Sequence, residues 1–170
     1  MILTGNAIAQ EHRRGAITIE PFDPVHLNPN SYNFHLHHRI LIRASHKDKW
    51  RICSIDKSGM VLFPGKLYLA ATAEVIGSDE NVVTLLGKSS IGRLGIFLNI
   101  TADLGHLGCR SRWTLEITVV KPVRVYAAMC IGQVAFWRTT NLQLNKYSGR
   151  YHRHLEPAPN RDLALLIGKL

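Results

Sequence analysis

Two parts of one stretch, residues 87–116, carry the side chains best suited to chemistry. The first part is a short polar turn that holds Lys88, Ser89, Ser90 and Arg93. Hydroxyls and cations placed together suit an anion, and an arginine offers a fixed fork of donors to a phosphate or a polarised carbonyl. The turn therefore predicts an anion site, with a structural surface turn as the alternative.

The second part is a predicted strand that carries a single acid, Glu116. In the sequence WTLEITV, the apolar residues 115, 117 and 119 alternate with the polar residues 114, 116 and 118, so the two sets face opposite sides. An acid in so apolar a strand is expected to be partly buried, which is costly without a partner. Glu116 therefore needs a cation partner or a role in proton transfer, and the two are compatible.

Two familiar motifs are imitated but incomplete. The GKS at 87–89 resembles the end of a phosphate-binding P-loop, but Val82 stands where its first glycine belongs, and IFLNIT at 96–101 predicts a strand where a helix should follow. The HLE at 154–156 resembles the His-x-Glu of zinc-dependent nucleobase deaminases, but the chain has no Pro-Cys-x-x-Cys. Neither a P-loop nor a zinc-dependent deaminase is expected.

Two histidines on another predicted strand raise the question of a metal site. Tyr32, Phe34 and Leu36 share one face of that strand, and His35 and His37 share the other. Alternate histidines can bind a metal, but the sequence places no third ligand beside them. We expect a solvent-exposed strand edge here.

The elements that must position these residues are mostly short strands. Thr4 is a suitable N-cap for one helix over residues 5–14, which Gly15 would end. Beyond it, short apolar runs separated by turns such as Pro64–Gly65 predict an all-β sandwich or barrel. Residues 139–151 are polar and indicate a mobile arm.

Composition narrows the class of protein. A chain of 170 residues fits a single domain, its apolar runs are too short to span a bilayer, and its first residues resemble no secretion signal. We therefore expect a cytoplasmic protein without a membrane partner. Cys53, Cys109 and Cys130 are expected to be reduced thiols. The net charge of +9 favours polyanionic partners, but the basic residues are scattered, so we do not expect nucleic acid to be the partner.

The blocks GKSSIGRLGIFLNITADLGHLG, WTLEI, KPVRVY and IGQVAFW together resemble the deoxycytidine triphosphate deaminases of the dUTPase superfamily. Supporting matches are LNPNSYNFHL, PGKLYLAAT and the tail YSGRYHRHLEPAPN. The resemblance implies one dUTPase-like domain over residues 1–170, a distorted jelly-roll or β-barrel that assembles as a homotrimer. It also implies that residues 139–160 form an arm that closes over the nucleotide, that Mg²⁺ accompanies the triphosphate, and that no zinc is used.

The same resemblance assigns roles to particular residues. Glu116 would be the general base and acid, Ser89 and the backbone near Thr101 and Ala102 would hold the water and the base edge, and Arg93 would supply positive charge. It further implies contacts to the nucleotide or its phosphates from Lys88, Ser90, His106, Thr114, Gln133, Tyr147, Arg150 and His154.

Several positions depart from the family pattern. Lys88 stands for a usual Arg, Asn99 for a common His, Arg150 for Lys and His154 for Gln. His106 replaces the Asp of an Asp-x-Gly loop on which diphosphatase members rely. This exchange argues against diphosphatase activity and leaves open a shifted substrate.

The favoured hypothesis is a zinc-independent hydrolytic deaminase that converts dCTP, or a close cytosine nucleotide, to dUTP and ammonia. One alternative is a dUTP or dCTP diphosphatase, or a bifunctional deaminase-diphosphatase. Another is a non-catalytic nucleotide-binding regulator on the same fold.

Overall fold

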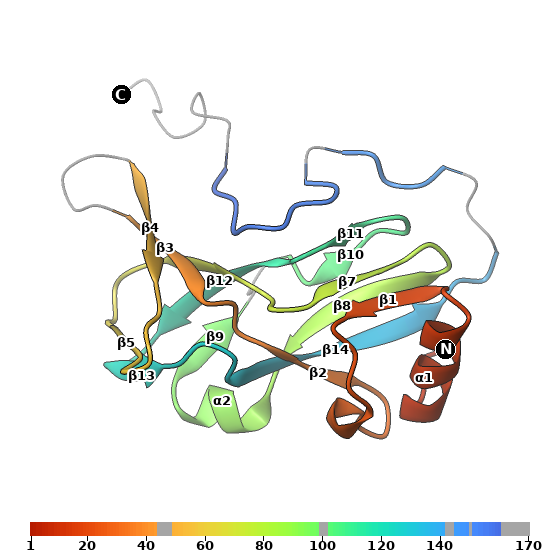
Figure 1. The fold of residues 1–170 in the computed structure, drawn as a ribbon, viewed down its shortest axis with the longest axis horizontal. Helices are drawn as coiled ribbons and strands as arrows, with labels where there is room; N and C mark the ends of the chain where they lie inside the picture. The colour runs from red at the N-terminus through yellow and green to blue at the C-terminus, as the bar shows by residue number, and fades with distance from the viewer. Residues whose placement is uncertain (44–48, 99–101, 142–144, 150, 161–170) are drawn as a thin grey trace.

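The computed structural model describes residues 1–43, 49–98, 102–141, 145–149 and 151–160 (Figure 1). Within them the chain forms mostly short strands, so the prediction of a mainly β fold is confirmed. The elements are α1 (Gly5–Arg13), β1 (Ile17–Glu20), η1 (Pro24–His26), β2 (Tyr32–His35), β3 (Arg39–Arg43), β4 (Trp50–Ser54), β5 (Met60–Leu62), β6 (Tyr68–Ala71), β7 (Val75–Ser78), β8 (Asn81–Gly87), α2 (Ser89–Arg93), β9 (Ile96–Leu98), β10 (Leu104–Gly105), β11 (Arg110–Ser111), β12 (Thr114–Val119), β13 (Val123–Val125) and β14 (Cys130–Arg138).

Helix α1 forms where its capping residues predict it. The hydroxyl of Thr4 accepts a hydrogen bond from the backbone N–H of Ala7 at 3.4 Å, and Gly15 adopts a φ of +79° just after the helix. Ile8 is fully buried on the face that packs against the sheets. The helix therefore closes one side of a β structure (Figure 1).

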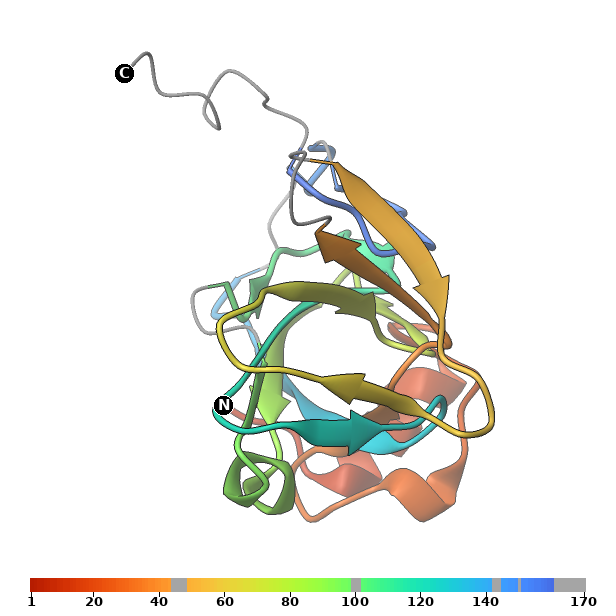
Figure 2. The same ribbon diagram turned by 90° about the vertical axis from the view of Figure 1, so that its left-hand side faces the viewer.

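The strands of the described part pair antiparallel and form four sheets. Their orders are β1-β7-β11, β10-β8-β14-β2, β4-β3-β6-β12-β9 and β13-β5. Figure 2 shows these sheets wrapped around a common interior. Tyr32, Phe34 and Leu36 are fully buried in that interior, as their spacing predicts, together with Phe136 of β14.

Strand β12 lies inside the five-stranded sheet, between β6 and β9. Leu115 and Ile117 are fully buried and Val119 nearly so, whereas the residues between them are partly exposed. Glu116 lies opposite Leu69 of β6 in the register. The alternation expected from the sequence is therefore present, and it turns Glu116 away from the core.

The expectation that no helix follows the GKS turn was wrong, although the predicted strand is present as β9. The short helix α2 follows Lys88, and the predicted strand, β9, begins only at Ile96. With five residues α2 is far shorter than the helix of a P-loop, and Val82 still occupies the position of the missing glycine.

The expectation of an exposed histidine edge was also wrong. His37 is only 6% exposed, and its Nδ1 accepts a hydrogen bond from the backbone N–H of Arg39 at 3.3 Å. The ring Nδ1 of His35 lies 2.5 Å from Oε1 of the buried Glu74. Segments distant in sequence cover this face, which strand periodicity alone does not reveal.

Three further properties bear on the class of protein. All three cysteines are free thiols, as expected. No helix in the described ranges is long and apolar enough to cross a membrane. In the same ranges, no three His, Cys, Asp or Glu side chains cluster in a way that could hold a metal ion.

Gly132 of β14 should be intolerant of any side chain. A Cβ at this position would lie 2.3 Å from the ring of Phe34 and 2.8 Å from the carbonyl oxygen of Leu86. We expect Gly132→Ala to lower the free energy of unfolding by about 1–3 kcal/mol, as overpacking of a core does. Gly87, its partner on β8, is the matched control, because a Cβ there meets no atom within 4 Å. Urea unfolding of both variants checks this, and equal losses would contradict it.

His37 should make the protein less stable as the pH falls. Burial, followed by repulsion from His38 and Arg112, lowers the pKa of His37 below its ordinary value of 6.5. The unfolded chain therefore binds the proton more readily, so stability is lost as the pH falls below about 6.5. We expect His37→Asn, whose amide oxygen can still accept from Arg39, to lose less free energy of unfolding between pH 7.5 and 5.5 than the wild type.

The exposed neighbour supplies the control for this experiment. Burial is the largest cause of the shift at His37, so His38→Asn should leave most of the pH dependence in place. A His37→Asn variant with the same pH dependence as the wild type would refute the interpretation.

Candidate active site

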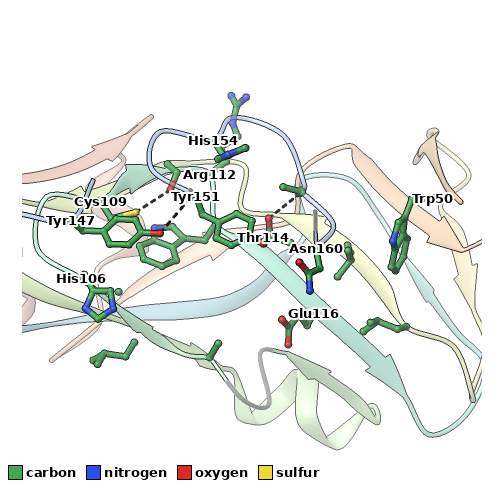
Figure 3. A pocket seen from close by; sticks show the side chains of 18 of the residues that line it. Trp50, His106, Cys109, Arg112, Thr114, Glu116, Tyr147, Tyr151, His154 and Asn160 are labelled. Carbon is green, nitrogen blue, oxygen red and sulfur yellow. Dashed lines mark hydrogen bonds between the residues drawn. The ribbon is translucent and has the colours of Figure 1, made fainter. Parts of the chain in front are cut away.

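A cavity of about 680 Å³ opens on the polar face of β12. Its wall combines β12 with the loop around His106, the facing ends of β3 and β4, and part of the segment 145–160, here called the arm. Figure 3 shows Glu116 between His106 towards one end and Trp50 towards the other. A cavity of this size suits a small-molecule ligand.

Glu116 is the acid of this cavity. It is the only carboxylate among the described residues of the cavity wall, and it is half-buried. Its carboxylate is carried on a central strand whose opposite face is fixed in the core. A rigidly held, partly buried carboxylate is well suited to moving protons in a bound ligand.

Basic side chains line the same cavity as the acid. Arg43 of β3 and Arg112, which lies between β11 and β12, both line the cavity, and His106 and His154 add two imidazoles. Because an arginine stays charged at any physiological pH, the wall favours an anionic ligand. Thr114 and Asn160 add uncharged hydrogen-bonding groups.

The arm forms one side of the cavity. The ring of Tyr147 stacks on His106 with centroids 5.5 Å apart, and its backbone N–H donates to the carbonyl of Leu107 at 2.9 Å. Further along, the N–H of Ala158 donates to the hydroxyl of Thr114 at 3.1 Å. The arm is therefore attached to the loop that carries His106 and to β12, which carries Thr114 and Glu116.

Ion pairs fasten the start of the arm. The Asp79 carboxylate lies 3.1 Å from Nζ of Lys146 and 3.1 Å from a guanidinium nitrogen of Arg110. Burial alone would raise the pKa of Asp79, but these two cations outweigh it and lower that pKa. The carboxylate is thus held ionised between the arm and β11.

The structure brings together six of the predicted site residues. The six that line the cavity are Ala102, His106, Thr114, Glu116, Tyr147 and His154. Thr101 and Arg150, together with the unusual Asn99, lie outside the described residues.

The remaining predicted residues lie elsewhere. Lys88, Ser89, Ser90 and Arg93 do not line the cavity, and α2 lies on the side of the molecule away from the arm (Figure 1). Ser89 and Arg93 are exposed and four residues apart on α2, so they share one face of it. The polar turn and Glu116 therefore do not meet in one cavity of the single chain.

Two of these displaced side chains make local contacts. Nζ of Lys88 lies 3.4 Å from Sγ of Cys130. The amide oxygen of Gln133 accepts from the hydroxyl of Ser31 at 2.8 Å, and its nitrogen donates to the carbonyl of Gly87 at 3.3 Å. Gln133 therefore connects β14 to Ser31 and to the end of β8.

Sequence reasoning missed several residues of the wall. Arg43 and Trp50 lie at the ends of β3 and β4, and no local pattern shows where that pair of strands meets β12. Arg112 and Trp113 immediately precede β12, so their closeness to Glu116 in sequence was a usable signal. Tyr151 stood inside the tail used for the family resemblance, although no role was assigned to it.

Comparison with known proteins places this geometry in a family. A family model described as dCTP deaminase-like matches residues 2–139. The chain is 39% identical over 166 residues to a dCTP deaminase of Rhodopirellula baltica, covering 94% of this chain and 83% of that protein. It is 43% identical over 159 residues to a dUMP-forming dCTP deaminase of Leptospira biflexa, covering 89% of this chain and 90% of that protein.

A solved structure supports the same fold. The crystal structure of 2'-deoxycytidine 5'-triphosphate deaminase from Agrobacterium tumefaciens matches with a TM-score of 0.64 at 23% identity. The match covers 79% of this chain but only 47% of that protein, so the chain spans about half its length. The likeness supports the fold, and the family model together with the two relatives shows that the chain belongs to the dCTP deaminase-like family.

Proposed function

We propose that the protein is a hydrolytic deaminase of dCTP, which replaces the amino group at C4 of the cytosine with oxygen and releases ammonia. The observation that carries the proposal is Glu116, the one carboxylate in the described wall of a cationic cavity. Relatives about 40% identical over most of the chain are named for this reaction. The prediction of deaminase activity on dCTP agrees with these relatives.

Glu116 is proposed to move the protons of the reaction. It takes one proton from a water molecule as the oxygen attacks C4, and delivers that proton to N3 of the ring. The tetrahedral intermediate then collapses when the C4–N bond breaks and the second proton of the water reaches the departing nitrogen through Glu116. The balance is one water consumed and one ammonia released.

The polar turn is proposed to join this site from a second copy of the chain. In one chain, Ser89 and Arg93 lie exposed on α2, outside the cavity that holds Glu116. A symmetric trimer can place α2 of one subunit against the cavity of the next. Ser89 would then hold the attacking water, and Arg93 would supply positive charge beside the reacting ring.

Magnesium is proposed to arrive with the triphosphate. A dedicated protein site for Mg²⁺ usually supplies one or two carboxylates, and Glu116 is the only one in the described wall. Because Glu116 is assigned to proton transfer, the cation fits best as a counterion held by phosphate oxygens and water. Arg43 would neutralise further phosphate charge.

The relatives favour dUMP as the final product. Several relatives are named dUMP-forming dCTP deaminases. From the sequence we expected dUTP as the product, with the bifunctional reaction as an alternative, and these names favour the alternative. The bifunctional reaction adds a second hydrolysis, in which water attacks the α-phosphorus and pyrophosphate leaves. His106, in place of an acidic residue, lines the cavity where that second water would have to be activated.

Incubation with dCTP and Mg²⁺ should release ammonia, and chromatography should detect dUMP with pyrophosphate. We expect Glu116→Gln to lower kcat by at least about a hundredfold, since a general base contributes that much, while dCTP still binds. Glu20→Gln, at the exposed end of β1, is the matched control and should keep wild-type kcat.

The products of this assay distinguish the alternative functions. Formation of dUTP without pyrophosphate would restore the monofunctional deaminase. Tight binding of dCTP without any product would favour a nucleotide-binding regulator, and normal turnover by Glu116→Gln would refute the proposed proton transfer.

A mixture of two inactive variants should regain activity if the site is shared. We expect Arg93→Ala and Glu116→Gln each to be inactive alone. Denatured together and refolded, random trimers would carry both wild-type residues in about a quarter of their sites, and activity should recover to about that fraction. Refolded wild-type protein sets the scale. A mixture that stays as inactive as its components would place both residues in one subunit's site.

A further inference from the structure

Arg112 joins three separate segments of the chain. Its backbone N–H donates to the carbonyl of His154 at 2.8 Å, Nε donates to the carbonyl of Ala73 at 3.1 Å, and Nη1 donates to the carbonyl of Leu155 at 3.4 Å. Ala73 lies between β6 and β7, whereas His154 and Leu155 belong to the arm. One residue therefore connects the sheet that carries Glu116 to the middle of the arm.

The two ion pairs of the arm differ from this contact. The pair of Arg39 and Glu156, 2.8 Å apart, has both side chains about half exposed, where water and salt weaken an ion pair. The bond of Lys146 to Asp79 holds only the beginning of the arm. Arg112 donates from a charged group to two backbone carbonyls, and a charged donor strengthens a hydrogen bond. The bond from Nε to Ala73 is partly buried and holds the guanidinium in place, whereas the bond from Nη1 to Leu155 is exposed.

The position of these bonds determines what the arm presents to the cavity. The arm residues that line the cavity come both before and after Leu155, namely Tyr147, Tyr151, His154, Ala158 and Asn160. Arg112 lines the same cavity, and Figure 3 shows it close to His154. Fixing the carbonyls of residues 154 and 155 therefore fixes the register in which the arm's side chains enter.

We propose that Arg112 is a positioning residue for the proposed reaction. Its guanidinium holds the arm in one register over the cavity of Glu116, so that Tyr151 and His154 are in place before the substrate binds. Binding then does not have to supply the free energy of ordering the arm. The inference rests on the proposed deaminase function for its kinetic part. The contact with the arm is independent of which nucleotide binds.

The test compares Arg112→Ala, Arg112→Lys and Arg39→Ala in the full chain. We expect Arg112→Ala to raise KM for dCTP about tenfold with a smaller change in kcat, the size expected for losing one hydrogen bond from a charged donor. Arg112→Lys keeps the charge but loses the rigid fork in which separate nitrogens donate to the two carbonyls, and should fall between. Arg39→Ala, which breaks only the exposed pair, should stay within about twofold of the wild type.

A second readout does not require turnover. Chymotrypsin cuts after tyrosine, and mass spectrometry can follow cleavage at Tyr147 and Tyr151 without nucleotide. We expect Arg112→Ala to speed this cleavage about tenfold, since cleavage tracks the population of the open arm, and Arg39→Ala to leave it unchanged. If the wild type does not deaminate dCTP, the cleavage rates still decide the role of Arg112.

Two results would overturn the proposal. Arg112→Ala with the wild-type KM and the wild-type cleavage rate would show that other contacts hold the arm. If Arg112→Ala fails to fold, Arg112→Lys decides, because a lysine variant with wild-type KM and cleavage would show that the rigid fork of the guanidinium is not needed.

Discussion

The burial of one face of β12 is the constraint on which the proposed site depends. Leu115 and Ile117 are fully buried between β6 and β9, and this fixes the strand along its length. Because side chains alternate, the same burial fixes Glu116 on the other face, where the cavity lies. A shift of one residue in register would place the acid in the core and a leucine in the cavity, so the packing that stabilises the sheet also specifies the chemistry.

The cavity itself is built from parts that carry no common sequence signal. β12 provides the acid, the β3 and β4 ends provide Arg43 and Trp50, and the arm adds Tyr147 and its neighbours. A central strand is well suited to hold a reactive group in place, whereas a segment without regular structure can adapt to the ligand. Arg112 lies where these two kinds of structure meet, and this position is the basis for proposing that it influences substrate affinity.

The sequence was most informative where one short pattern determines the outcome. Alternation in WTLEITV predicted the two faces of β12, and the capping residues Thr4 and Gly15 predicted α1. The sequence was not informative where distant segments determine the environment of a residue. The strand pattern predicts that His37 is exposed, yet only 6% of it is exposed because other parts of the chain cover it. Arg43 and Trp50 were missed for the same reason, since contacts between separate strands determine their position at the cavity.

Closeness in sequence also misled in one respect. The polar turn and Glu116 lie within one stretch of thirty residues, residues 87–116, yet α2 lies outside the cavity of Glu116 and away from the arm. Because α2 lies outside that cavity, the hydroxyl and guanidinium on its exposed face do not meet the Glu116 of their own subunit. In a symmetric assembly such a helix can meet the cavity of a neighbouring subunit, because each copy of the chain carries both the helix and the cavity. Under the proposed function, assembly is then a requirement of catalysis, and selection on α2 acts through the neighbouring subunit.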